Sequence, residues 1–202
     1  MTTWQFLKTH WIMSLIALAI LLTAAVSITW AVITREGDEG FLRVEGGFEL
    51  KWLPGDMPIP CTHDQVPASW LELYDKARKE VRDKVGRELF GPCVAWQLER
   101  PFPAYMSGSV TLHAVKLDDN GGSTVLRWAK DSGQVLSADV KLNTDSLERY
   151  RYRIVIHELG HVLGLTHDRL QDSIMFPAVN VRPGTLSTTD VKHLKAAYAG
   201  AR

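Results

Sequence analysis

The sequence predicts an α+β domain that follows one membrane-spanning helix. Three observations support this prediction. A long run near the start contains no charged side chain, and one later segment repeats apolar residues every three or four positions, as a helix does. The stretch that follows this segment alternates apolar and polar residues, as strands do. A chain of 202 residues has room for one globular domain and an appendage of this kind.

The membrane-spanning helix is expected over residues 11–34, after a short tail of residues 1–10. The run is longer than the roughly 20 apolar residues that cross a bilayer as a helix. Trp11 and Trp30 lie near its ends, where interfacial aromatic residues are common. A cleaved signal peptide is the alternative, but its apolar core would span only about 7 to 15 residues. The Lys and Arg residues on the two flanks leave the orientation of the helix open.

The globular domain is expected over residues 48–202, with residues 35–47 as a charged juxtamembrane linker. Alternating apolar residues predict a strand at the start of the domain, near Phe48. An amphipathic helix is expected next, over 67–90, because its apolar residues recur at helical spacing and would face the core. Those residues are Trp70, Tyr74, Ala77, Val81 and Val85.

Strands are expected from residue 94 to residue 143, separated by turns rich in Pro, Gly and Asp. Their apolar residues are Val94 and Trp96, then Val110, Leu112 and Ala114, then Val125, Leu126 and Trp128, and finally the run from Val135 to Leu142. The acidic turn at 118–122 could bind Ca²⁺. Because no further carboxylates follow at the spacing of a calcium loop, a plain hairpin turn is favoured and Ca²⁺ is unsupported.

A second helix is expected from Asp145 to about Leu163, because Asp145 and Glu148 form a capping-box pattern at its start. The basic and aromatic residues that follow, from Arg149 to Arg153, are most simply interpreted as the outer face of this helix. The charge balance gives no reason to expect a nucleic-acid partner, since 23 Lys and Arg residues match 23 Asp and Glu residues.

The end of this helix carries a metal-binding pattern. His157 and His161 are one helical turn apart, so both imidazoles face the same way and can reach one metal ion. Gly164 follows at a position where a helix that stops abruptly favours a residue with positive φ. The chain can then return and bring His167 to the metal as the third ligand.

Three protein ligands leave a fourth position open, which is typical of a catalytic zinc site and not of a structural one. Glu158 is next to a ligand and can act as general base towards a zinc-activated water. The five-residue pattern from His157 to His161 alone often marks a solvated helix face. The added Gly164 and His167 make a chance match far rarer, so the metal site is favoured.

The segment from His157 to His167 resembles the HExxHxxGxxH signature of the metzincin zinc endopeptidases. Two later segments resemble the matrixin family: Ser173–Pro177, with Met175, is similar to its Met-turn, and Leu186–Tyr198 is similar to its closing helix. The resemblance implies a zincin-like domain with a twisted mixed sheet backed by helices. Asp168 departs from the pattern, because matrix metalloproteinases more often have Ser there and Asp is typical of adamalysins.

The resemblance also implies roles for residues around the metal. Met175 is expected to pack under the imidazoles without binding the metal. Asp168 is expected to accept hydrogen bonds that orient the lower part of the site, with an exposed aspartate at a helix end as the alternative. The strand Val135–Asn143 is similar to the one that lines the cleft, so a peptide substrate would bind extended along it as an edge strand. The loop Phe176–Leu186 would shape the pocket for the side chain after the scissile bond.

Three interpretations remain for the two cysteines, Cys61 and Cys93, which flank the first expected helix of the domain. They could form a disulfide in an oxidising compartment, or remain two buried thiols. As a third interpretation, Cys61 could be a latency ligand like the cysteine of matrixin propeptides, although Pro58–His63 does not match that motif.

Together these observations predict a membrane-anchored zinc endopeptidase with one catalytic Zn²⁺ and with Glu158 as general base. Its protein or peptide substrates would be cut outside the cytoplasm, in a periplasmic or extracellular space. The alternative is a non-catalytic, membrane-tethered, zinc-bound interaction module. Against this alternative, the chain retains Glu158 together with all three histidines, although an inactive module would be free to lose the base.

Overall fold

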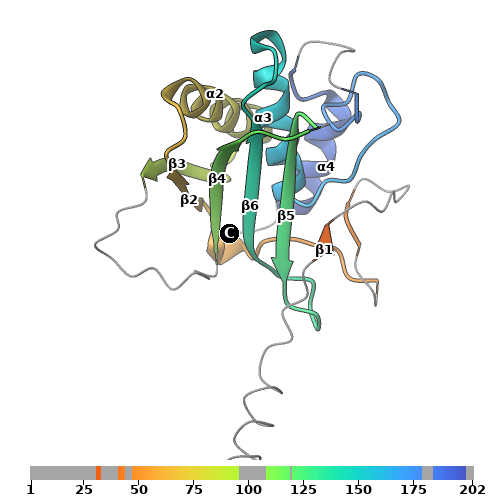
Figure 1. Cartoon of the computed structure of the whole chain (residues 1–202). Helices are drawn as coiled ribbons and strands as arrows, with labels where there is room; N and C mark the ends of the chain where they lie inside the picture. Colours follow the sequence, from red (N-terminus) through yellow and green to blue (C-terminus); the bar gives the residue numbers. More distant parts are fainter. Residues whose placement is uncertain are drawn as a thin grey trace, which may run out of the picture.

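The computed structural model of the chain describes residues 31–32, 41–43, 47–95, 108–118, 120–178 and 184–198. In chain order the elements (Figure 1) are β1 (Ala31–Val32), the 3-10 turn η1 (Pro54–Asp56), β2 (Ile59–Asp64), α2 (Ala68–Val85), β3 (Phe90–Ala95), β4 (Ser109–Val115), β5 (Gly122–Trp128), β6 (Val135–Asn143), α3 (Glu148–Val162) and α4 (Thr188–Tyr198).

The strands form one sheet in the order β1-β5-β6-β4-β2-β3. The pairs β6–β4, β4–β2 and β2–β3 are parallel, whereas β5 runs antiparallel to β6 and to β1. The helices lie behind the sheet in Figure 1, with α3 packed on β5 and β6, and α2 packed on α3. The predicted α+β class, with a mixed sheet backed by helices, is therefore confirmed.

The first helix of the domain forms because one face of it is apolar. All five residues of the predicted stripe in α2 are buried, and a valine such as Val81 contributes roughly 1.5 to 3 kcal/mol by leaving water. The helix ends at Val85, because Gly86 takes a left-handed conformation with φ 85° and its N–H donates to the carbonyl of Arg82. The prediction that this helix reaches Phe90 is wrong, since Phe90 already begins β3.

The two cysteines form a disulfide between neighbouring strands. Cys61 of β2 and Cys93 of β3 lie opposite each other in the parallel pair, and their sulfur atoms are bonded. No free thiol is left at either position. The interpretations with two thiols or with Cys61 as a latency ligand are therefore wrong.

The residues before β2 pack against the end of α3 instead of forming a long strand. The N–H of Leu42 donates to the carbonyl of Gly164 at 2.7 Å, and the indole N–H of Trp52 donates to the carbonyl of Val162 at 2.8 Å. Leu42, Leu50 and Trp52 are all buried, although Leu42 belongs to the segment that we predicted as a linker. The core of the domain therefore includes residues that precede Phe48.

The predicted membrane anchor lies mostly outside the described residues, which contain none of 11–30 or 33–34. Ala31–Val32 form β1 and pair with β5 at Leu126 and Val125. In the part of the chain that the structure describes, no helix combines the length and apolar character needed to cross a membrane.

Two local predictions next to the site are wrong. The strand Val135–Asn143 is not an edge strand, because β6 has β5 on one side and β4 on the other. Asp145 does not cap α3, which starts at Glu148 after Leu147 and has no side-chain cap. The Asp145 carboxylate instead pairs with Lys116 at 3.0 Å. The backbone N–H of Asp145 donates to Oδ1 of Asn143.

Candidate metal centre and cleft

The end of α3 and the chain after it bring three imidazoles together. Gly164 has φ 88° and lets the chain turn back at the end of the helix, so that His167 reaches His157 and His161. One ring nitrogen from each histidine lies within 4.8 Å of the others, and the Nε2 atoms of His161 and His167 are 3.2 Å apart. Tetrahedral zinc bound by imidazoles keeps its nitrogen ligands about 3.3 Å apart, so this donor set fits zinc.

Backbone carbonyls orient two of these imidazoles. Nδ1 of His157 lies 2.8 Å from the carbonyl oxygen of Ile174, and Nδ1 of His161 lies 2.9 Å from that of Leu165. Because a carbonyl oxygen only accepts, each Nδ1 carries the hydrogen and each Nε2 presents its lone pair to the metal position.

Burial also favours the neutral rings that metal binding requires. It lowers the pKa of His157 to about 4 against the opposing hydrogen bond to Ile174, and lowers the pKa of His161 to about 3.

Within the turn that follows the third histidine, Met175 is buried together with Ser173 and Ile174. The Met175 sulfur lies against Gly160 of α3, where a side chain would collide with it. The N–H of Met175 donates to Oγ of Ser173 at 3.0 Å. Met175 therefore packs on the metal-binding helix through its sulfur.

A buried carboxylate on α4, which sequence reasoning missed, holds this turn in place. Asp190 accepts from the Ser173 hydroxyl at 2.6 Å, from the Ile174 N–H at 2.9 Å and from the Ser187 N–H at 2.7 Å. The backbone N–H of Asp190 donates in turn to the Ser187 hydroxyl oxygen at 3.2 Å. The pattern Ser187-x-x-Asp190 is capping-box-like and is the signal that could have revealed it.

Glu158 is buried on the sheet side of the helix. Its side chain is held by Thr124 of β5, whose hydroxyl donates to Oε2 at 2.7 Å. Burial raises the pKa of Glu158 to about 7, against the opposing effect of the Thr124 hydrogen bond. The sequence motif does not reveal Thr124, since this contact joins residues 34 positions apart.

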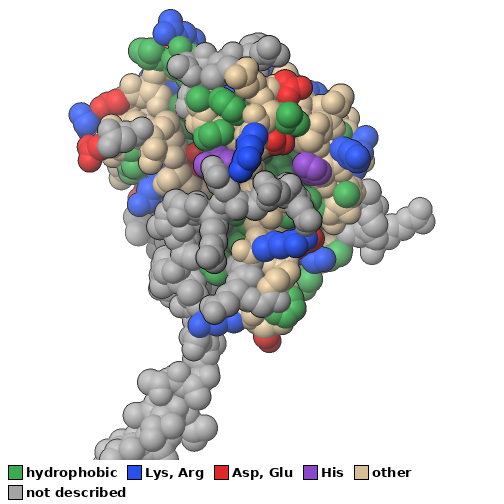
Figure 2. All heavy atoms as spheres, turned by 90° about the vertical axis from the view of Figure 1, so that its right-hand side faces the viewer, with side chains coloured by type: hydrophobic (Ala, Val, Ile, Leu, Met, Phe, Trp, Pro, Cys, Tyr) green, Lys and Arg blue, Asp and Glu red, His purple; other side chains and the backbone are tan. Residues whose placement is uncertain are grey.

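The three imidazoles and Glu158 border an open cleft of about 310 Å³. Its lining comes from the turn before β5 and the first residues of that strand, from α3, and from Phe176 and Pro177. Figure 2 views the molecule from the side on which β5 and α4 lie, where histidine side chains reach the surface. The edge of the cleft is therefore β5, not the predicted β6.

Arg153 is a second cleft residue that the sequence did not reveal. It lies one turn before His157 on α3, is buried, and lines the cleft. Its guanidinium donates to the carbonyl of Phe176 at 3.0 Å and so fixes the start of the wall that follows the Met-turn.

The described end of the same wall is held by α2. Glu80 accepts from the Thr185 hydroxyl at 2.6 Å, from the Leu186 N–H at 2.8 Å and from the Tyr152 hydroxyl at 2.6 Å. Burial alone would raise the pKa of Glu80, but these hydrogen bonds and Lys84 lower it. Of the predicted loop Phe176–Leu186, residues 179–183 lie outside the described part of the chain.

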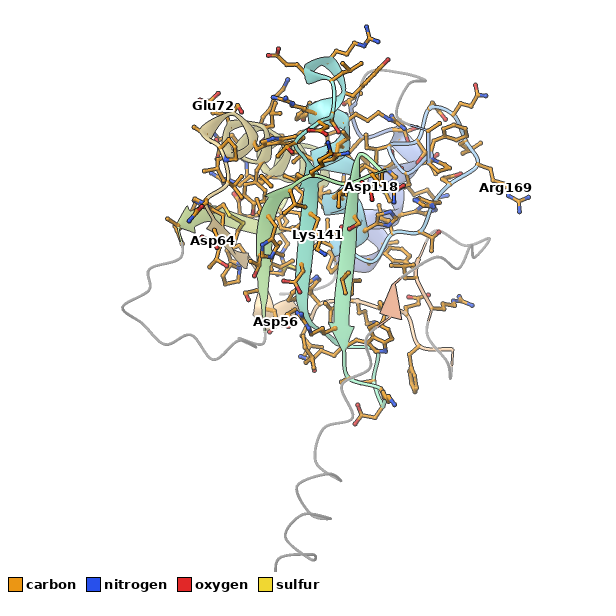
Figure 3. The ribbon with its side chains drawn as sticks, viewed as in Figure 1. Asp56, Asp64, Glu72, Asp118, Lys141 and Arg169 are labelled. Atoms are coloured by element: carbon orange, nitrogen blue, oxygen red, sulfur yellow. A yellow bond between two sulfur atoms is a disulfide. The ribbon has the colours of Figure 1, made fainter. Side chains whose placement is uncertain are left out.

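Asp168 braces the chain that follows the third histidine. Its Oδ1 accepts from the Leu170 N–H at 2.9 Å, and its own N–H donates to the carbonyl of Met175 at 3.0 Å. The carboxylate therefore orders a turn, and the backbone links that turn to the methionine. The side chain of Arg169, in the same loop, points away from the molecule (Figure 3).

Asn143 organises the acidic turn at 118–122, for which the sequence favours a hairpin turn over a Ca²⁺ site. Its amide donates to the carbonyls of Leu117 and Asn120 at 2.9 and 2.7 Å and so holds the turn closed. Asp118, labelled in Figure 3, lies in this turn. Among the described residues, the histidine triad is the cluster whose donors could hold a metal.

Comparison with known proteins agrees with this geometry. The family model described as Matrixin matches residues 103–199. The Metalloendoproteinase 5-MMP of Arabidopsis thaliana is 39% identical over 49 residues, which cover 23% of this chain and 14% of that protein. The Macrophage metalloelastase of Oryctolagus cuniculus is 29% identical over 92 residues, which cover 41% of this chain and 19% of that protein. The matched segments thus span less than a fifth of the length of either relative.

Proposed function

We propose that this chain, which belongs to the matrixin family, is a zinc-dependent endopeptidase. The observation that carries the proposal is the convergence of three imidazoles and one buried carboxylate on the same open cleft. A structural zinc site would be closed by a fourth protein ligand. Here the three histidines face a cleft that has room for a substrate.

His157, His161 and His167 would hold the metal. When bound, zinc supplies a Lewis acid that polarises a peptide carbonyl and lowers the pKa of water beside it. Glu158 accepts the proton of the attacking water and delivers it to the leaving amine nitrogen. A carboxyl whose pKa is raised by burial suits both steps, because it takes up and releases a proton near neutral pH.

A peptide substrate would bind extended along β5. This strand borders the cleft through Gly122, Ser123 and Thr124, whereas its pairing with β1 involves only Val125 and Leu126. Main-chain hydrogen bonds to an exposed strand edge bind a peptide with little regard to its sequence. Selectivity would then come from the pockets for its side chains.

The pocket for the side chain after the scissile bond would lie between α3 and the wall that begins at Phe176. Arg153 contributes a positive charge to this lining, next to Ile154 and Pro177. A basic substrate side chain would meet a like charge there, so we propose a preference for apolar or acidic residues at this position.

The disulfide between Cys61 and Cys93 and the family both favour a location outside the cytoplasm, where cysteines stay oxidised. We retain the proposal that residues 11–34 anchor the chain in a membrane, because an uncharged run of this length is typical of a spanning helix. Protein or peptide substrates would then be cut close to the membrane surface.

The test is hydrolysis of a quenched peptide library by the full chain with one equivalent of zinc, beside Glu158→Gln and beside wild type with a chelator. We expect cleavage by the wild type only, with zinc still bound by Glu158→Gln. The library also reports whether basic residues are excluded after the cut. If zinc binds stoichiometrically and both proteins are equally inert, the chain is a zinc-bound interaction module and the peptidase proposal fails.

A further inference from the structure

The carboxylate of Glu158 is held from the sheet and not from its own helix. Thr124 and Gly122, two residues of β5 that face α3, enclose it on one side. Neither residue belongs to the metal-binding motif. Their positions on the strand that borders the cleft link the orientation of the base to the surface where a substrate would bind.

Thr124 supplies a directed hydrogen bond. Its side chain is 8% exposed, and its hydroxyl lies 2.7 Å from Oε2 and 3.2 Å from the backbone carbonyl of Glu158. A hydroxyl has a single hydrogen to donate. The carboxylate oxygen, which is closer, is a stronger acceptor than the carbonyl oxygen and therefore receives it. Because β5 pairs with β6 at Thr124 and Val140, the backbone that carries this hydroxyl is fixed.

Gly122 supplies space. A β-carbon at this position would lie 2.8 Å from Oε1 and 2.9 Å from Cγ of Glu158, closer than real contacts allow. Gly122 does not have a positive φ, so a residue with a side chain could adopt the same backbone conformation. The absence of a side chain matters here because the carboxylate occupies that space.

We infer that Thr124 and Gly122 are positioning residues for the general base: the hydroxyl fixes one carboxylate oxygen, and the glycine leaves room for the orientation that results. This inference rests on the proposed peptidase function and extends it to residues of the substrate-binding strand. A base held in one orientation accepts a proton without first reorganising, and that advantage belongs to turnover rather than to binding. Zinc affinity should not depend on either residue, because neither contacts an imidazole ligand atom in the hydrogen bonds described.

The test uses three variants of the full, zinc-loaded chain. Thr124→Val keeps the size and the branched shape and removes the hydroxyl, Thr124→Ser restores the hydroxyl, and Gly122→Ala pushes the carboxylate aside with the hydroxyl intact. The measurements are kcat and KM on a peptide that the wild type cleaves, the zinc dissociation constant, and the thermal unfolding midpoint.

We expect Thr124→Val and Gly122→Ala each to lower kcat about tenfold, with KM and zinc affinity within about twofold of wild type. Thr124→Ser should recover kcat to within about threefold. A kcat unchanged in Thr124→Val, or a loss that Thr124→Ser shares equally, would overturn the inference. If the wild type binds zinc and cleaves nothing, the peptidase proposal fails on its own. Crystal structures of wild type and Thr124→Val then decide the inference, which is wrong if the carboxylate has not moved.

Discussion

The two sides of the cleft hold their functional groups by different means. The lower side is formed by the chain that follows α3. There, the backbone carbonyls of Ile174 and Leu165 orient His157 and His161. On the sheet side, a single side-chain hydroxyl, that of Thr124, orients Glu158. The lower side depends on the path of the chain after α3, and the sheet side depends on the identity of two residues of β5, Thr124 and Gly122.

This difference predicts that the two sides can be damaged separately. A carbonyl is present whatever the side chain, so the metal ligands are sensitive only to changes that move the turn, such as loss of Asp190. The base is sensitive to a change of one functional group. Zinc affinity should therefore report on the lower side, and turnover at saturating zinc should report on the sheet side.

The largest effect is expected from Glu158→Gln, which removes the base and keeps the shape. We expect kcat to fall about 10³-fold, equivalent to about 4 kcal/mol in the barrier, while the zinc dissociation constant changes little. Steady-state kinetics and zinc titration by a chromogenic chelator measure both quantities. Equal losses of turnover and zinc affinity would contradict the separation of the two sides.

Removal of the disulfide tests whether general instability imitates damage to either side. Replacing both Cys61 and Cys93 by Ala should lower the free energy of unfolding by about 3 to 4 kcal/mol, because the unfolded chain regains the freedom that the cross-link removes. The bond joins β2 and β3 at the edge of the sheet away from β5. At temperatures where the variant is folded, zinc affinity and kcat should match wild type, and chemical denaturation with parallel kinetics checks this. A variant that is folded but inactive would contradict the expectation.

Asp190→Ala should damage the lower side. It leaves the Ser173 hydroxyl and the N–H groups of Ile174 and Ser187 without their acceptor in a buried place, at a cost of about 3 kcal/mol in unfolding free energy. Zinc affinity should fall with it, since the turn that orients His157 loosens. Asp83→Ala, at an exposed position of α2, is the matched control and should stay within about 0.5 kcal/mol of wild type. Unfolding curves with and without zinc distinguish the two variants.

The smallest effect is expected at the far end of the cleft wall, from Glu80→Gln. Because the folded-state pKa of Glu80 is lowered, its ionised form adds stability above the usual carboxyl pKa and loses it as pH falls through the folded value. The variant should be about 1 to 2 kcal/mol less stable than wild type at pH 7, and the difference should shrink as pH falls below the ordinary carboxyl pKa and through the lowered folded-state pKa of Glu80. Unfolding measured across this pH range checks the sign, and a difference that grows on acidification would contradict it.

The sequence predicted what short-range patterns encode. The stripe from Trp70 to Val85, the histidine triad with Gly164, and the class of the fold all follow from spacing along the chain. The order of strands does not, because β5 and β6 have similar alternation, and only pairing and packing place β5 beside the cleft and β6 between β5 and β4. For this reason the cleft strand was misassigned.

Residues that act across long sequence separations were also missed. Thr124, Arg153 and Asp190 are ordinary polar residues in the sequence, and only the packing of β5, α3 and α4 gives them partners. The capping prediction at Asp145 was wrong because α3 starts only at Glu148, after Leu147, and the backbone N–H of Asp145 donates to the side chain of Asn143. Local propensity is overridden where tertiary contacts compete for the same group.

The most direct test of the account is X-ray absorption at the zinc edge for the full chain loaded with one equivalent of zinc, beside His167→Ala. We predict three imidazole nitrogens and one light-atom ligand from solvent in the wild type, with one imidazole fewer in the variant. A spectrum with four protein ligands, or one that His167→Ala leaves unchanged, would contradict the catalytic site described above.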